Sequence, residues 1–165
     1  MNTTEIILAI DPGYDRVGVA LISLSEGKGI LIHSACIVTK KTDTQEKRLA
    51  YIYTRLETML TTWIPTTIAL ETLFFSINKK TVMKVAESRG VIVLLAGLHN
   101  LPLIELSPQE VKLAMTGIGN ANKTAVQKMV SLSLKIDTNG KLDDEIDAIA
   151  LGFAAVGYIK QKKWK

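Results

Sequence analysis

The chain has 165 residues, the length of one ordinary domain, which excludes a protein built from several domains. Hydrophobic residues make up 47% and charged residues 22% of it, a composition that excludes intrinsic disorder. The 20 Lys and Arg outnumber the 16 Asp and Glu only because four lysines lie within residues 160–165, so any surface for a polyanion in the rest of the chain must be local.

Three consecutive strands are predicted at the start of the chain. Residues 6–10 form an unbroken apolar run that ends at Asp11-Pro12-Gly13, as expected for a buried strand that enters a turn. Residues 17–24 are rich in Val, Ile and Leu and follow only a short turn, which favours antiparallel pairing with the first strand. Residues 30–39 are expected to extend this meander.

Helices and single strands alternate in the middle of the chain. From residue 44, apolar residues recur at three- and four-residue steps, which predicts an amphipathic helix that ends before Pro65. Residues 67–70 return to a strand pattern. Residues 78–100 form a second long helical pattern, which Gly90 or Gly97 could end early, and residues 103–106 form a short strand.

Three more helices complete the predicted order βββαβαβααα. The first begins at Ser107-Pro108-Gln109-Glu110, which combines a capping Ser, Pro at the first helical position and Glu three residues after the cap. The other two are expected at residues 122–135 and 143–158. This order predicts one layered α/β domain with a mixed sheet.

Four acidic residues stand at the ends of predicted elements, where open α/β sheets build their sites. Asp11 ends the first strand, and Glu71 directly follows the strand at 67–70. Asp144 and Asp147 are three residues apart at the start of the last helix and therefore share one of its faces. A turn or a helix N-terminus could explain each aspartate alone, but no such role explains Glu71.

Several acids in one cleft would repel each other unless a cation lay between them. Oxygen ligands without a Cys or His cluster select Mg²⁺, or Mn²⁺ in its place, over Zn²⁺. Two such ions per active site can position a water and stabilise the leaving oxygen of a phosphodiester. The chemistry implied is phosphoryl transfer to water.

Six short motifs resemble, in order and spacing, the RuvC family of Holliday-junction resolvases. They are Ile10-Asp11-Pro12-Gly13, Ala69-Leu70-Glu71-Thr72-Leu73-Phe74, Glu87-Ser88-Arg89-Gly90, Gln109-Glu110-Val111-Lys112, Gly117-Ile118-Gly119-Asn120-Ala121-Asn122-Lys123 and Asp144-Glu145-Ile146-Asp147-Ala148. The resemblance covers residues 6–155, and the ordered combination is far more specific than any single motif. The chain departs from the usual bacterial pattern at Tyr14-Asp15-Arg16, as a divergent, for example phage-borne, member would.

The resemblance implies an α/β fold of the ribonuclease H-like (RNase H-like, retroviral-integrase) superfamily, with a five-stranded mixed sheet flanked by helices on both faces. Residues 1–159 would form this single nuclease domain, and residues 160–165 a basic C-terminal tail. The resemblance also implies a homodimer with a catalytic metal site, whose ligands by motif position are Asp11, Glu71, Asp144 and Asp147. Asp143 is a neighbouring alternative to Asp144. We favour Asp144 because two residues separate the family's two helical ligands, as they separate Asp144 and Asp147 here.

By the same resemblance, five residues would bind DNA. Phe74 occupies the position of an aromatic residue that stacks near the junction crossover. Lys112 and Lys123 match basic positions of the family's DNA-binding surface, and Lys79 and Lys80 would add backbone contacts. By residue chemistry alone, Phe74 could equally enter the core and each lysine could be a solvated charge.

The function implied is an Mg²⁺-dependent, structure-selective endodeoxyribonuclease. It would resolve four-way (Holliday) DNA junctions by paired nicks in opposed strands during homologous recombination and DNA repair. The branch-migration proteins RuvA and RuvB are the expected partners. A single cysteine, Cys36, and the lack of an export signal or a spanning apolar run predict a cytoplasmic protein without membrane contact.

Three alternatives stay open. The first is a related nuclease that acts on other branched nucleic acids. The second is a small actin-like phosphate-binding domain of the ATPase type, because Asp11-Pro12-Gly13 and the following hairpin resemble the first phosphate loop of those enzymes. No second such loop is evident, and the chain is too short for two lobes. The third is a junction-binding protein without catalysis, against which the four acids argue.

Overall fold

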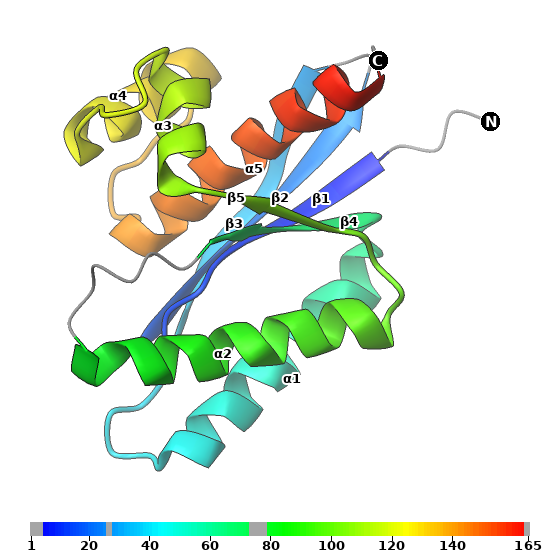
Figure 1. The fold of residues 1–165 in the computed structure, drawn as a ribbon, viewed down its shortest axis with the longest axis vertical. Helices are drawn as coiled ribbons and strands as arrows, with labels where there is room; N and C mark the ends of the chain where they lie inside the picture. Colours follow the sequence, from blue (N-terminus) through cyan, green and yellow to red (C-terminus); the bar gives the residue numbers. More distant parts are fainter. Residues whose placement is uncertain (1–4, 26–27, 73–78, 164–165) are drawn as a thin grey trace.

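The structure is a computed structural model that describes residues 5–25, 28–72 and 79–163. A central sheet lies between two layers of helices, with α1 and α2 on one face and α3, α4 and α5 on the other (Figure 1). The elements in chain order are β1 (Glu5–Asp11), β2 (Arg16–Ser25), β3 (Lys28–Val38), α1 (Gln45–Trp63), β4 (Thr67–Glu71), α2 (Lys79–Leu98), β5 (Leu103–Leu106), α3 (Pro108–Thr116), α4 (Lys123–Leu134) and α5 (Asp143–Lys163). The predicted order βββαβαβααα is confirmed.

The sheet has five strands in the order β3-β2-β1-β4-β5. The meander β1-β2-β3 is antiparallel, whereas β4 pairs in parallel with both β1 and β5. The sheet is therefore mixed and covered on both faces, as expected.

Burial on both faces explains the unbroken apolar run of β1. Ile7 and Ala9 belong to the core beneath α5, while Leu8 and Ile10 belong to the core beneath α1 and α2. All four are at most 1% exposed. Because successive side chains of a strand point to opposite faces, a strand covered on both sides needs apolar residues at every position.

The helix ends follow the predicted signals, with one difference. Helix α1 ends at Trp63, and its C-cap Ile64 adopts the left-handed conformation (φ 47°) before Pro65. The predicted capping box of Ser107 and Glu110 starts α3. Neither Gly90 nor Gly97 interrupts α2. Helix α5 continues to Lys163 rather than ending at residue 158, because Lys and Gln are good helix formers and no Pro follows.

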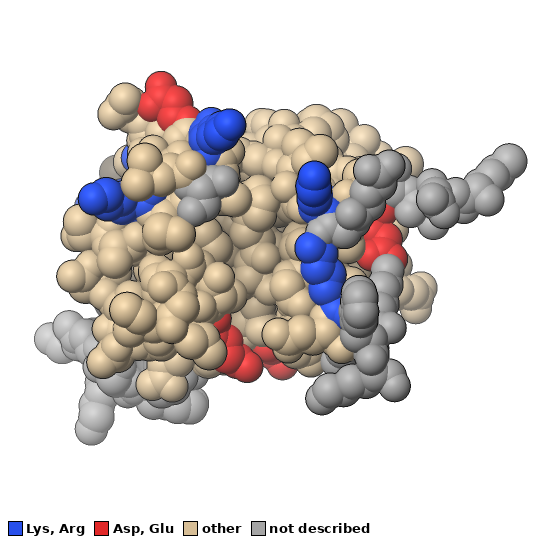
Figure 2. Space-filling model, turned by 90° about the horizontal axis from the view of Figure 1, so that it is seen from above, with Lys and Arg blue, Asp and Glu red and all other residues tan. Residues whose placement is uncertain are grey.

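Charge is unevenly distributed over the molecule. Figure 2 views the end that carries α3, α4 and the last turns of α5, and its centre is uncharged while Lys and Arg lie in separate groups toward the sides. A basic surface must therefore be local, as the composition predicts. None of the described helices combines the length and the apolar character that a membrane span requires.

Candidate active site

Strand pairing places Asp11 and Glu71 side by side. Strands β1 and β4 are parallel, and Ile10 pairs with Leu70. The next residues along the two strands, Asp11 and Glu71, therefore emerge at the same edge of the sheet. This is the carboxyl edge at which open α/β sheets bind ligands.

Gly18 lets the start of α5 approach the same edge. It pairs with Asp11 across β1 and β2. A Cβ atom on Gly18 would lie 1.8 Å from the carbonyl oxygen of Asp144, so the helix backbone occupies the space of the missing side chain. This contact brings the first turn of α5, with Asp144 and Asp147, over the end of β1. The structure thus gathers all four predicted acids.

The first turn of α5 is also anchored to β3. The buried Glu145 carboxylate accepts a hydrogen bond from Ser34 Oγ at 2.6 Å and pairs with Lys141 Nζ, also at 2.6 Å. Asp144 and Asp147 flank this residue in the sequence. The contacts of Glu145 with β3 therefore fix the backbone of the helix turn that carries them.

The four acids influence each other electrostatically. Burial raises the pKa of Asp11 to about 8, helped by the negative charges of Glu71, Asp147 and Asp144. Burial and the charge of Asp147 raise the pKa of Glu71 to about 7. The pKa of Asp147 is also raised, mainly by burial. Buried, mutually repelling carboxyls with raised pKa values are typical of functional sites.

Two basic side chains balance part of this charge. Lys123 Nζ lies 2.9 Å from Asp147 Oδ2 and 3.5 Å from Asp143 Oδ2. Burial alone would lower the pKa of Lys123, but the contacts with Asp147 and Asp143 raise it. Arg16 Nε lies 2.9 Å from Asp144 Oδ2. Both cations are counter-ions of the acidic cluster as well as candidate ligands for phosphate.

The donor set suits a hard cation. Asp144 Oδ2 is a buried oxygen that makes no hydrogen bond within the described residues, although Arg16 lies close, because the approach lacks hydrogen-bond geometry. Asp143 instead faces α4, where Gln127 Nε2 donates to its carboxylate at 3.1 Å. No three His, Cys, Asp or Glu side chains in the described part of the chain are close enough together to form a finished metal site. The acids are therefore neighbours, and their side chains would have to move closer together to hold a cation.

A pocket of about 210 Å³ opens beside the acids. Glu71 and Asp147 line it together with Lys112 and Lys123, over an apolar floor that includes Val111. The positive charge of Lys112 also opposes the rise in the pKa of Glu71. Both predicted DNA-binding lysines therefore lie at the acidic site, where they can contact a phosphate next to it.

Some predicted residues are not placed. Phe74 lies outside the described residues. Lys79 and Lys80 form the start of α2, but their side chains are also outside the described part of the structure. Conversely, sequence reasoning missed Arg16 and Gly18. A glycine within an apolar strand is a signal of close backbone approach, and it could have identified Gly18.

Comparison with known proteins identifies the family. A family model described as crossover junction endodeoxyribonuclease RuvC matches residues 7–155. The protein of that name from Brachyspira hyodysenteriae is 43% identical over 149 residues, which cover 90% of this chain and 92% of that protein. The one from Carboxydothermus hydrogenoformans is 38% identical over 154 residues, covering 93% and 96%.

The fold comparison agrees. The structure of Thermus thermophilus RuvC in complex with a Holliday junction substrate matches with a TM-score of 0.88 at 24% sequence identity, covering 96% of both chains. The expected RNase H-like fold is confirmed. The chain belongs to the family of crossover junction endodeoxyribonuclease RuvC.

Proposed function

We propose that the protein is a structure-selective endonuclease that resolves four-way DNA junctions by paired hydrolytic nicks in opposed strands, during recombination and repair. The observation that carries this proposal is the gathering of four acids and two lysines at the carboxyl edge of β1 and β4, in a chain of the RuvC family. A family member is solved with a Holliday junction substrate, which supports the choice of DNA.

Asp11, Glu71, Asp144 and Asp147 would hold two Mg²⁺ ions per active site, with Mn²⁺ able to substitute. When bound, the metal supplies an activated water and stabilises the leaving oxygen. The raised pKa values of Asp11, Glu71 and Asp147, and the buried Asp144 oxygen that accepts no hydrogen bond from a described residue, support this ligand set. We place Asp144 in it rather than Asp143, since Asp144 Oδ2 is buried and accepts no hydrogen bond from a described residue, whereas the Asp143 carboxylate accepts one from Gln127.

Cleavage of a synthetic four-way junction tests the function. We expect two symmetric nicks with Mg²⁺, none with EDTA, and little cleavage of linear duplex. Equal cleavage of other branched DNA would favour a nuclease that acts on branched nucleic acids in general. Binding of the junction without cleavage would favour a non-catalytic junction-binding protein. Hydrolysis of ATP without DNA cleavage would favour the actin-like alternative.

Lys112 and Lys123 would bind phosphates beside the acids. Replacing either with Ala should lower the slope of log K against log salt for junction binding by about one unit, because each removes one phosphate contact. Lys128, an exposed residue on the same helix as Lys123, provides the matched control and should leave the slope unchanged. Unchanged slopes in both variants would mean that the DNA follows another path. Phe74, Lys79 and Lys80 stay predicted DNA contacts.

The metal proposal also predicts how stability depends on pH. Without metal, the folded protein keeps the Asp11 proton up to a pKa of about 8, whereas the unfolded chain releases it near 3.8. Between these values the folded state binds more protons, so rising pH lowers stability. Mg²⁺ should raise the melting temperature and weaken this dependence, because it binds the folded state. Melting curves in EDTA and Mg²⁺ check this, and identical curves would contradict a metal site.

The active form would be a homodimer, because a two-fold dimer presents one site to each of two equivalent strands. Helix α2 exposes Val93, Leu94 and Leu98, which are 41%, 56% and 60% exposed. Leu94→Asp should therefore yield monomers in light scattering. Leu132→Asp on α4, where Leu132 is 63% exposed, should leave the dimer intact. A monomeric wild-type protein would contradict the dimer. We also propose that the branch-migration proteins RuvA and RuvB are partners of this protein.

A further inference from the structure

A second groove borders the acidic cluster at Asp144. Its volume is about 540 Å³, and its lining includes Tyr14, Asp15, Arg16, Thr39, Lys41 and Asp144. It shares Asp144 with the acidic cluster, whereas the pocket of Lys112 and Lys123 shares Glu71 and Asp147. The two pockets therefore border different acids of the same cluster, and DNA bound at the acids can reach both.

The groove carries excess positive charge. Arg16 and Lys41 line it, and the Arg48 guanidinium and Lys84 ammonium lie 4.8 and 5.1 Å from the centre of the Tyr14 ring. Its two acids are already paired, Asp15 with Arg48 and Asp144 with Arg16. Exposed Lys41 has no ion pair with any described residue. This charge balance suits an anionic ligand.

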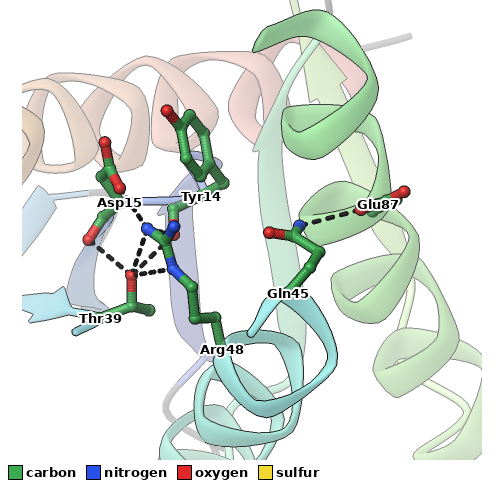
Figure 3. A network of polar contacts seen from close by, with 6 residues as sticks. All are labelled: Tyr14, Asp15, Thr39, Gln45, Arg48 and Glu87. Carbon is green, nitrogen blue, oxygen red and sulfur yellow. Dashed lines mark hydrogen bonds and ion pairs between the residues drawn. The ribbon is translucent and has the colours of Figure 1, made fainter. Parts of the chain in front are cut away.

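The segment that leads into Arg16, residues 14–15, is held in place by a side chain of α1. The buried side chain of Arg48 donates hydrogen bonds to the Tyr14 carbonyl and to Thr39 Oγ1, each at 2.9 Å, and also contacts the Asp15 carboxylate (Figure 3). The Thr39 amide donates to the Asp15 carbonyl at 2.9 Å. A segment that is ordered before binding loses less entropy when a ligand arrives.

Arg16 itself is loosely held. Its side chain is 45% exposed, and Asp144 Oδ2, only 2.9 Å away, receives no hydrogen bond from it. The Asp144 side chain is only 23% exposed, so this ion pair is partly buried. Because it lacks hydrogen-bond geometry, it holds Arg16 less firmly than a charge-assisted hydrogen bond would. A cation bound at the Asp144 carboxylate would neutralise the charge that attracts Arg16.

We propose that this groove binds a backbone phosphate of the DNA through Arg16 and Lys41, and that a divalent cation at Asp144 releases Arg16 for this contact. The proposal rests on the proposed function, which supplies DNA as the polyanion. Cation and DNA then strengthen each other's binding through Arg16. The contact of Lys41 does not depend on the cation.

Salt titrations of junction binding, in EDTA and in Ca²⁺, test both parts, with gels to verify intact DNA and melting curves to verify folding. Lys41→Gln should lower the slope of log K against log salt by about one unit in both conditions, and Arg16→Gln by about one unit in Ca²⁺ only. The exposed residues Lys28, at the far end of β3, and Arg55, on α1, provide matched controls. Lys28→Gln and Arg55→Gln should leave the slope unchanged.

A second variant tests the release of Arg16 without metal. In EDTA, Asp144→Asn should raise junction affinity more when Arg16 is present than in the Arg16→Gln background, a coupling that a double-mutant cycle isolates. Slopes of Arg16→Gln and Lys41→Gln equal to the controls would overturn the phosphate site. An equal loss for Arg16→Gln in EDTA and Ca²⁺, or no coupling, would overturn the release. A wild-type protein that neither binds nor cuts junctions would refute the proposed function instead.

Discussion

Asp11→Asn, Glu71→Gln and Asp147→Asn should each slow junction cleavage in Mg²⁺ by at least about 100-fold. Loss of a group that only supports a metal ligand already costs about 10- to 100-fold, so loss of the ligand itself should cost more. Junction binding should persist or tighten slightly, because each change removes a negative charge that repels phosphate. Single-turnover cleavage and anisotropy measure the two effects separately.

Stability distinguishes this loss from misfolding. Without metal at about pH 8, the folded protein must either keep Asp11 protonated or bury its charge. Asp11→Asn removes this cost and should raise stability by at least about 1 kcal/mol, or about 2–4 °C in Tm for a domain of this size. Glu46→Gln, at a fully exposed carboxylate on α1, is the control and should change neither cleavage nor binding. Cleavage at the wild-type rate by any of the three variants would exclude that residue from the metal site.

The sequence predicts most of this site because local signals and strand pairing act together. Asp11 and Glu71 each end an apolar strand, and parallel pairing of β1 with β4 then sets them side by side. Asp144 and Asp147 share a helix face by their spacing alone. To predict these placements, one needs to know only which segments are strands or helices and where each one ends. Apolar runs, Pro and capping residues indicate both in the sequence.

Contacts between residues far apart in the sequence were not predictable. Lys123 could be recognised as basic, but its ion pair with Asp147 depends on how α4 packs beside α5. The pairing of Arg16 with Asp144 likewise depends on the closeness of β2 and α5. Neither hydrophobic periodicity nor a helix-capping residue predicts such contacts. The side chains of Lys79 and Lys80 and the place of Phe74 stay untested for a different reason, since they lie outside the described residues.

Gly18→Ala should disrupt the site more than its size suggests. The new methyl group would lie 1.8 Å from the Asp144 carbonyl oxygen and 2.4 Å from its carbonyl carbon, so the backbone of α5 must move. Forcing extra atoms into a packed core costs about 1–3 kcal/mol. The displacement also carries Asp144 and Asp147 away from Asp11, and a shift of about 1 Å at a reacting centre can cost about 100-fold in rate. Cleavage should therefore fall even under conditions where the variant is fully folded.

Gly157→Ala is the matched control, because Gly157 lies on the same helix and a Cβ atom there would meet no atom within 4 Å. That substitution should stabilise the protein by about 0.5–1 kcal/mol, since glycine within a helix costs that much relative to alanine. Thermal melting compares the two variants, and cleavage is measured well below both midpoints. If Gly18→Ala melted and cut DNA like the wild type, α5 would not press on β2 at this point. The mutual position of Asp11 and Asp144 would then need another cause, since Gly18 pairs with one and contacts the backbone of the other.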